Sequence, residues 1–315
     1  MFDPNQFITP EEVKNLAQRA LPDRKILSVE SIVRGSTNLL YKTKTDQGNV
    51  IIKISHRPDR IEQGILKKEI EFLNTYSQKD WGIPIPKIIW EGTSPHGYPA
   101  FIQTELTGKR VEDIISDDVD STTAAFTLGK FLAQLHQNTA KHINEFEKGR
   151  DIFPDFSSYA HYWLKDWEEL CSQAPHVRQG QIQEAYAFIK NNLHHFSEKD
   201  WPYVHADISK ENLLGEVVDG KLVLTGLCDF ENMQTAPMEY DIATIDDGIF
   251  LFYPHLEQPF LEGYQTITPL PQNYMERLKV VNLFRALRYI KRTVKYNEVH
   301  YYNHDKVYFE KWLYK

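Results

Sequence analysis

One short stretch carries side chains of the types and spacing that phosphoryl transfer needs. His205, Asp207 and Asn212 form the pattern His-x-Asp-x-x-x-x-Asn, and Asp229 follows in an Asp-Phe-Glu triplet. Phosphoryl transfer uses one carboxylate to orient and deprotonate an attacking hydroxyl. An amide and a second carboxylate hold Mg²⁺ on the nucleotide phosphates. Asp207, Asn212 and Asp229 supply these groups.

The residues between Asn212 and Asp229 predict a β-hairpin. An apolar run at 213–218 precedes Asp-Gly at 219–220, which is a two-residue turn signal, and 222–227 is the returning strand. Asn212 then stands at the entry of the hairpin and Asp229 at its exit, so the two side chains lie near each other. That proximity suits a shared Mg²⁺, which prefers a few oxygen ligands from protein.

These motifs, with Tyr-Asp-Ile-Ala at 240–243, resemble the aminoglycoside phosphotransferase and choline kinase superfamily. Protein kinases share the layout but usually have Arg where this chain has Ala206 and Gly where it has Glu231. The resemblance therefore favours small-molecule kinases. It implies Asp207 as the catalytic base, and Asn212 and Asp229 as Mg²⁺ ligands.

Thr9 and Glu12 form a capping-box pattern, which predicts that a helix begins after Thr9. The chain that follows predicts three strands joined by turns, at 26–33, 39–45 and 49–54. The first turn, Gly-Ser-Thr-Asn, places Ser36, Thr37 and Asn38 where they could offer hydroxyls and backbone N–H groups to nucleotide phosphates. Taken alone, it also fits an ordinary hairpin turn. The resemblance favours the phosphate loop, and the absence of a Gly-Lys-Ser/Thr sequence excludes a P-loop.

Lys53 lies near the end of the third strand amid apolar residues, where an unpaired ammonium would be costly to bury. Its expected role is to contact the α- and β-phosphates, with an acid on the next helix, predicted at 60–76, as its partner. Glu69 and Glu71 compete for this role. The Glu-x-x-x-Leu pattern of the family favours Glu69, and Glu71 is expected to face water.

A change of pattern near residue 107 predicts the boundary between two lobes. Residues 1–106 are expected to form a nucleotide-binding lobe and 107–315 a catalytic and acceptor-binding lobe. Glu105 and Leu106 would form the hinge, where main-chain groups contact adenine. Helical, leucine-rich segments follow, and His136 in one of them is expected to be structural.

Acceptor-binding residues are harder to find from sequence. Tyr162 and Trp163 belong to an aromatic helix that predicts either core packing or an aromatic wall for a cationic acceptor. Glu231, Asp246 and Asp247 are further acidic candidates. The resemblance gives Asp241 a structural role beneath the catalytic loop.

Composition is that of a globular protein. A 41% hydrophobic and 25% charged chain of 315 residues is ordinary for a soluble protein, and a net charge of −8 argues mildly against nucleic-acid binding. Cys171 and Cys228 fit neither a metal cluster nor a disulfide framework. No signal peptide or apolar span is visible, which predicts a cytoplasmic protein without a membrane partner. We also expect a monomer or homodimer that does not bind nucleic acid.

Together these features predict an α+β, bilobal, protein-kinase-like fold that binds the nucleotide between its lobes. The predicted reaction transfers the γ-phosphoryl of ATP, or of GTP, with Mg²⁺, to a hydroxyl of a small molecule. An antibiotic of the aminoglycoside type, hygromycin included, or a related metabolite is the expected acceptor. A choline or ethanolamine kinase and a nucleotide-binding regulatory pseudokinase remain as alternatives.

Overall fold

The computed structural model describes residues 7–32, 38–62, 64–144 and 152–315. These residues form two compact units. The first holds the described residues up to Val119 together with Glu211–Met233, and the second holds the rest of the described chain. The hairpin after Asn212 thus packs with the N-terminal segment, although it lies far along the chain. The division into functional lobes near residue 107 stays a prediction.

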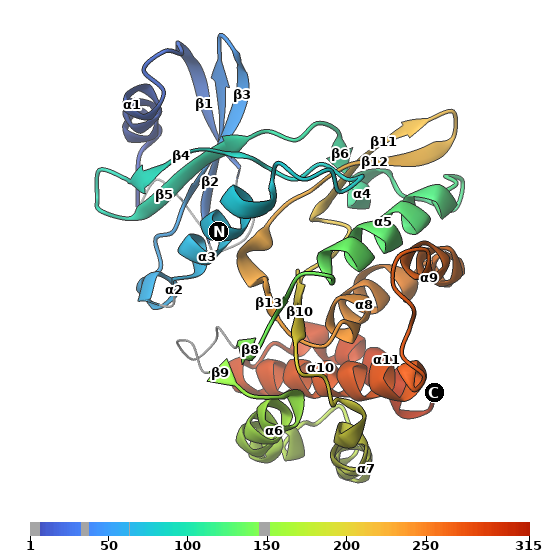
Figure 1. The fold of residues 1–315 in the computed structure, drawn as a ribbon. Helices are drawn as coiled ribbons and strands as arrows, with labels where there is room; N and C mark the ends of the chain where they lie inside the picture. Colours follow the sequence, from blue (N-terminus) through green and yellow to red (C-terminus); the bar gives the residue numbers. More distant parts are fainter. Residues whose placement is uncertain (1–6, 33–37, 63, 145–151) are drawn as a thin grey trace. The chain divides into compact units, whose positions relative to one another are not determined.

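The first unit is built on a five-stranded antiparallel sheet of order β1-β2-β3-β5-β4 (Figure 1). Buried and more exposed residues alternate along β2, as expected for a strand with one face on a core. Helix α1 packs on β1 and β2 and adds Val13 and Leu16 to that core. The first six elements are α1 (Pro10–Ala20), β1 (Ile26–Ile32), β2 (Leu39–Thr45), β3 (Gly48–Ile54), α2 (Pro58–Glu62) and α3 (Ile65–Tyr76).

Two local signals act in this unit as the sequence predicts. Thr9 caps α1 by accepting a hydrogen bond from the Glu12 N–H, and the Glu12 carboxylate accepts one from the Thr9 N–H at 2.8 Å, which completes a capping box. In the later hairpin, Asp219 and Gly220 have φ values of 51° and 75°. Two positive φ values are what a type I′ turn requires.

The predicted helix over 60–76 is interrupted. Gly64 has a φ of 65°, a left-handed conformation that a regular helix does not contain, and α3 begins after it. The rest of the unit comprises β4 (Ile88–Thr93), β5 (Pro99–Thr104), β6 (Lys109–Arg110), α4 (Val111–Ile114), β11 (Leu213–Val218), β12 (Lys221–Leu227) and the 3₁₀ turn η3 (Phe230–Asn232).

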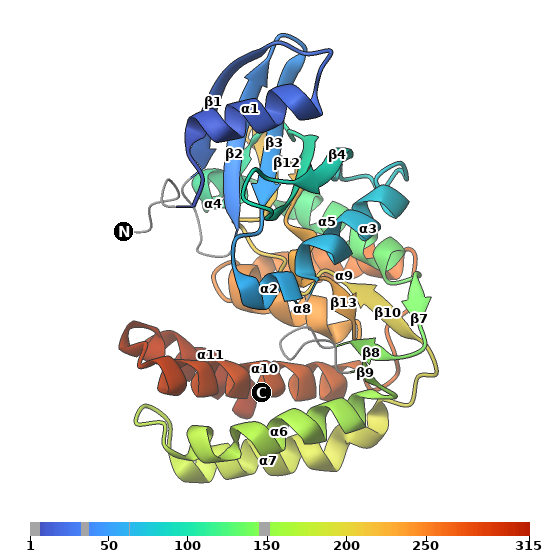
Figure 2. The same cartoon turned by 90° about the vertical axis from the view of Figure 1, so that its left-hand side faces the viewer.

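The second unit is mainly helical and is organised around α10 (Tyr274–Tyr296), which packs against α6, α7, α8 and α11 (Figure 2). Its core is aromatic: Trp163, Trp167 and Phe284 are each almost fully buried. Burying one such side chain contributes roughly 1.5–3 kcal/mol. The other helices are α5 (Thr122–Leu135), α6 (Phe156–Ser172), α7 (Gln179–Asn192), α8 (Glu239–Ile245), α9 (Glu257–Gln265) and α11 (Tyr302–Leu313).

Short strands and turns complete this unit. The strand β10 pairs with both β7 and β13, and it leads directly into the His-x-Asp loop. A π-helical turn, η4 (Asp246–Phe250), follows α8 without a break. The remaining elements are β7 (Thr139–Ala140), β8 (Ile143–Asn144), β9 (Ile152–Phe153), η2 (Leu193–His195), β10 (Trp201–Val204), β13 (Gln234–Thr235), η5 (Pro254–Leu256) and η6 (Val299–Tyr301).

None of the helices in the described ranges has both the length and the apolar character needed to cross a membrane.

Candidate active site

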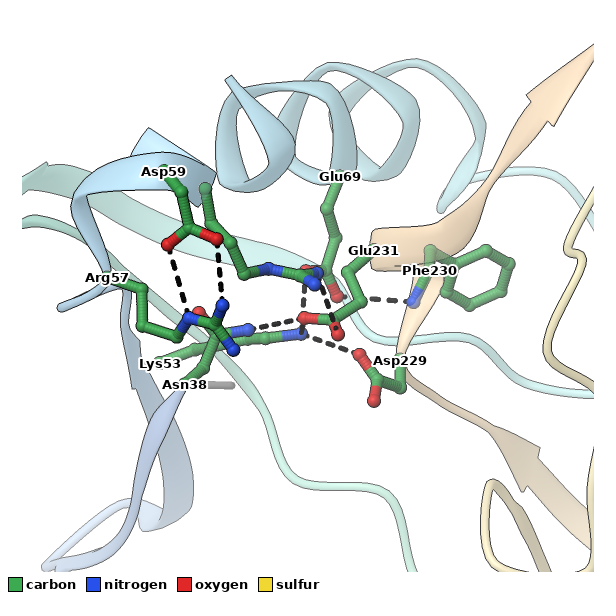
Figure 3. Close-up of polar contacts among 9 residues, drawn as sticks. Asn38, Lys53, Arg57, Asp59, Glu69, Asp229, Phe230 and Glu231 are labelled. Atoms are coloured by element: carbon green, nitrogen blue, oxygen red, sulfur yellow. Dashed lines mark hydrogen bonds and ion pairs between the residues drawn. The ribbon is translucent and has the colours of Figure 1, made fainter. Parts of the chain in front are cut away.

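In the first unit, Lys53 is the centre of a buried charged cluster (Figure 3). Its Nζ donates to Oε2 of Glu69 and to Oδ1 of Asp229, both at 2.7 Å, and lies 3.4 Å from Oε2 of Glu231. The three carboxylates come from α3 and from the segment that follows β12. The cluster therefore joins the sheet, the helix and the Asp-Phe-Glu segment through one ammonium.

The expected ion pair with Glu69 is present. Glu69 is 1% exposed, and its second oxygen accepts a hydrogen bond from the Phe230 N–H at 3.3 Å. Glu71 points to solvent, where it lies 3.8 Å from the exposed Lys67. The choice between the two acids follows from helical spacing, because residues two apart on a helix face different directions.

Glu231 takes part in this cluster, a role that the sequence did not reveal. Its carboxylate accepts a hydrogen bond from Nδ2 of Asn38 and forms an ion pair with Arg60 at 3.0 Å. Asn38 is the last residue of the predicted phosphate loop, and Ser36 and Thr37 of that loop lie outside the described residues. Glu231, a candidate for binding the acceptor, is thus a buried partner of three residues of its own unit.

Burial and charge oppose each other at the centre of the cluster. Burial by itself would lower the pKa of Lys53, but the carboxylates of Asp229, Glu69 and Glu231 outweigh it and raise this pKa well above its usual value. Burial raises the pKa of Glu69 and Lys53 opposes that shift. We take the lysine as protonated, because it is the cation that three carboxylates share.

The donor set of this cluster suits a divalent cation. Carboxylate oxygens of Glu69, Asp229 and Glu231 lie within 4.8 Å of one another, and hard cations prefer oxygen ligands. The Asp229 side chain is 35% exposed, so a ligand can reach it. Asn212 stands at the base of the hairpin, where its carbonyl accepts the Cys228 N–H at 3.0 Å. Asn212 and Asp229 thus flank the paired strands, as predicted.

The two hinge candidates lie just after β5. The Glu105 carboxylate pairs with Lys42 at 2.7 Å and accepts a hydrogen bond from Asn49 at 2.7 Å, so its side chain is engaged by neighbouring strands. Leu106 packs so closely on Gly226 that a Cβ there would lie 2.7 Å from its Cδ1. Both side chains are therefore engaged by residues of their own unit, and the role of this segment as a hinge stays a prediction.

In the second unit, Asp241 holds the backbone of the His-x-Asp loop. Its two carboxylate oxygens accept hydrogen bonds from the N–H groups of His205 and Ala206, at 2.9 and 2.7 Å. His136 contacts the same carboxylate at 3.1 Å and the Tyr264 hydroxyl at 2.8 Å. The structural roles expected of Asp241 and His136 are confirmed.

This support keeps Ala206 in a left-handed conformation, with a φ of 62°. A non-glycine residue pays roughly 1–2 kcal/mol for that conformation, so it persists where the surroundings fix the backbone. The next N–H, of Asp207, donates to Nδ1 of the buried His205 at 3.3 Å. Asp207 is thus presented, partly exposed, from a loop whose backbone is held from beneath.

The remaining acceptor candidates fall into two groups. Trp163 is 1% exposed and stacks on Trp167, which makes it a core residue, while Tyr162 is 41% exposed. The buried Asp246 accepts hydrogen bonds from Lys311 and from the indole of Trp312, both at 2.7 Å. Asp247 is less engaged and faces His304 at 3.0 Å.

Comparison with known proteins identifies the family. A family model described as "Phosphotransferase enzyme family" matches residues 28–276. The chain belongs to this family. The predicted family and enzyme class are confirmed: this is a phosphotransferase of the small-molecule kinase type.

Relatives and solved structures of different names match most of its length. A homoserine kinase from Chelativorans sp. (strain BNC1) is 25% identical over 295 residues, which cover 89% of this chain and 84% of that protein. The crystal structure of aminoglycoside phosphotransferase APH(4)-Ia is 12% identical with a TM-score of 0.71, covering 97% of this chain and 98% of that one. A putative fructosamine-3-kinase from Haemophilus somnus 129PT has a TM-score of 0.65 at 16% identity, over 96% and 97%. The kinase-like fold is thereby confirmed.

Proposed function

We propose that the protein transfers the γ-phosphoryl group of ATP to a hydroxyl of a small molecule, with Mg²⁺. The observation that carries this proposal is the buried Lys53, paired with Glu69 and Asp229 at 2.7 Å each. A lysine fixed in this way by an acid on a neighbouring helix is the arrangement that positions nucleotide phosphates in kinases. Solved structures of the same fold are described as complexes with GDP, ADP or AMP-PNP, which supports a nucleotide ligand and leaves GTP open.

The first unit would bind the nucleotide and its metal. Lys53 would contact the phosphates, with Ser36, Thr37 and Asn38 in the loop above them and main-chain groups of Glu105 and Leu106 at the base. Asn212 and Asp229 would hold Mg²⁺, which neutralises the charge that builds up on the phosphates. Glu231 lies close enough to Asp229 to contribute to the same site.

The second unit would provide the base. Asp207 would accept the proton of the acceptor hydroxyl, and Asp241 would position it by fixing the backbone of the loop. Little covalent work falls to the protein in phosphoryl transfer, so positioning and charge neutralisation account for most of the catalysis. The need for exact positioning accounts for the hydrogen bonds that hold the backbone of the His-x-Asp loop.

For the acceptor, we favour a small metabolite over an aminoglycoside. The homoserine kinase shares 25% identity across most of the chain, whereas APH(4)-Ia, which is an aminoglycoside enzyme, shares 12%. Choline and ethanolamine remain to be tested as acceptors. The presence of Lys53, Glu69, Asp207, Asn212 and Asp229 together argues against a regulatory pseudokinase, since such a protein would have no need for all five.

The test is Mg²⁺-dependent consumption of ATP and of GTP in the presence of homoserine, ethanolamine, choline, hygromycin B and kanamycin. We expect acceptor-stimulated turnover that Asp207→Asn lowers by at least about 100-fold. Nucleotide binding with no turnover on any acceptor would favour the regulatory alternative. Equal turnover by the Asp207→Asn protein would contradict the assignment of the base.

A further inference from the structure

Two buried arginines on α10 have very different surroundings. Arg277 is fully paired: its Nε and Nη2 donate to the two oxygens of Glu239 at 2.6 and 3.1 Å, and its Nη1 contacts Glu198 and the His195 carbonyl. This guanidinium has two carboxylates around it. Its charge is neutralised within the fold.

Arg285 lies eight residues later on the same helix and is 7% exposed. Its Nη2 donates to the Tyr289 hydroxyl at 2.6 Å. Its Nε is buried and has no hydrogen-bond partner among the described residues, and no described carboxylate forms an ion pair with this arginine. A guanidinium stays charged at any physiological pH, and a buried charge without a counter-ion is costly. The surroundings of Arg285 therefore call for an anion.

Two aromatic rings lie close to this guanidinium. Its Cζ lies 5.7 Å from the centre of the Tyr240 ring and 5.4 Å from that of Tyr289. Asp247 also acts on it electrostatically, although the two form no ion pair. An apolar, partly shielded setting of this kind strengthens any charge-assisted hydrogen bond that an incoming anion makes.

The residues around Arg285 are also next to those that contact the catalytic loop. Tyr240 precedes Asp241, which holds the loop backbone. Asp247 precedes Gly248, where a Cβ would lie 3.7 Å from the Cα of Ser209, two residues after Asp207. Asp247 and Gly248 belong to the π-helical turn η4. Such turns are rare and frequently occur at functional sites.

We propose that Arg285 binds a carboxylate of the acceptor, so that the acceptor is a small hydroxy acid or hydroxy amino acid. This proposal rests on the kinase function proposed above. The guanidinium offers donors in a fixed planar fork that matches a carboxylate, and the hydroxyl of the same molecule would reach Asp207. Aminoglycosides and choline carry only positive charge, so a buried arginine at this position disfavours them.

Matched acceptors test the proposal on the unaltered protein. L-Homoserine carries a carboxylate and an ammonium, 4-hydroxybutyrate lacks the ammonium, and 3-amino-1-propanol lacks the carboxylate; L-serine and ethanolamine form a second pair. In at least one of these sets, we expect the acid to be phosphorylated with a kcat/KM at least about 30-fold above that of the matching amino alcohol. This factor is the lower end of the effect seen when one partner of a buried charged pair is removed. Higher kcat/KM values for the amino alcohols or for aminoglycosides would overturn the proposal while leaving the kinase function intact.

Variants of Arg285 then assign the effect to this residue. Arg285→Gln should raise the KM for the acid at least about 30-fold with little change in kcat or nucleotide affinity, and Arg285→Lys should restore part of the loss. Arg292→Gln is the matched control, because Arg292 lies on the same helix with a 44% exposed side chain. An unchanged KM in Arg285→Gln would contradict the proposal.

Thermal unfolding separates a ligand-binding role from a structural one and needs no turnover. Without acceptor, Arg285→Gln should leave Tm unchanged or raise it, because it removes an unpaired buried charge, whereas Arg277→Gln should lower Tm. The preferred acid should raise the Tm of the unaltered protein and not that of Arg285→Gln. If an acid binds in this way but is never phosphorylated, the carboxylate site stands and the kinase function fails. If no acid of the panel raises Tm or is phosphorylated, the carboxylate site is rejected.

Discussion

The two units hold their reactive groups by different means. In the first, side chains hold one another: Lys53 binds three carboxylates, and Arg60 and Asn38 bind one of these, Glu231. In the second, one side chain holds backbone: Asp241 accepts the N–H groups of His205 and Ala206. The first arrangement depends on charge, and the second depends on geometry.

This difference suits the chemistry assigned to each unit. A site for phosphates and a metal must balance several charges, and a cluster of ion pairs can rearrange when those ligands arrive. A catalytic base needs a fixed position relative to the proton that it takes, and small displacements are costly. Substitutions that change charge but not shape should therefore act differently in the two units.

The largest effect is expected at Asp207. Asp207→Asn keeps the shape of the side chain but removes its ability to accept a proton, so turnover should fall by about 10²–10⁴-fold. Nucleotide affinity should stay within about 2-fold, since the base contributes little to ground-state binding. Steady-state kinetics with the preferred acceptor and titration with a non-hydrolysable ATP analogue measure the two. A parallel loss of nucleotide affinity would contradict this separation.

Asp241→Asn should have the next largest effect. The amide can accept through one oxygen only, which leaves a loop N–H without its partner at a cost of about 1–3 kcal/mol. We expect turnover to fall by about 10- to 100-fold with a lower Tm, while the KM for ATP changes little. Chemical denaturation and initial rates provide the comparison. A normal Tm and normal turnover would show that Asp241 does not position the loop.

Glu69 and Glu71 form a matched pair for testing the charged cluster. Glu69→Gln removes one of three carboxylates from Lys53, so we expect the KM for ATP to rise by about 10-fold, equivalent to about 1.4 kcal/mol. Glu71→Gln is the control, because its side chain is 68% exposed and pairs with the exposed Lys67 on the surface of α3. The rates of both variants are compared over a range of ATP concentrations. Equal behaviour of the two would argue against a role for the Lys53–Glu69 pair.

The smallest effect concerns pH and His304. Hydrogen bonds to Asp247 and Asp305 raise the pKa of His304 to about 10, above its ordinary value of 6.5, against the opposing effect of burial. The folded protein thus holds this proton more tightly than the unfolded chain. The contribution of protonated His304 to the free energy of unfolding is fully present below pH 6.5 and is lost as the pH rises through about 10.

His304→Gln should therefore flatten the fall in stability between neutral and alkaline pH. The rings of Tyr289 and Tyr308 lie next to His304. Burial raises the pKa of Tyr289 to about 12 and that of Tyr308 well above its usual value, so the ionisation of these two hydroxyls falls above this range. Urea denaturation at several pH values, together with a direct NMR titration of the imidazole, measures the effect. An imidazole that titrates near pH 6.5 in the folded protein would rule out this account.

Local patterns in the sequence were enough to predict many features. Helix capping at Thr9, the type I′ turn at Asp219-Gly220 and the preference for Glu69 over Glu71 all depend on residues a few positions apart. The structural role of Asp241 came from a family motif. For features of this kind, spacing along the chain is itself the physical constraint.

Other features depend on partners that are distant in sequence. Glu231 meets Asn38 and Arg60 only because β12 delivers the Asp-Phe-Glu segment to the first unit. The break at Gly64 was missed for a different reason: apolar residues at helical spacing on both sides of this glycine predict one continuous helix. Asp246 and Asp247 are adjacent in sequence, yet only Asp246 is buried by Lys311 and Trp312 of α11.

The sequence by itself determined the chemistry of this protein, because the reactive side chains occur at fixed spacings in short motifs. The tertiary structure decided which charges are neutralised. Arg277 and Arg285 occupy the same helix and have the same intrinsic charge, but Glu239 pairs with only one of them. A counter-ion is a matter of distance in space, and the linear order of residues does not specify it.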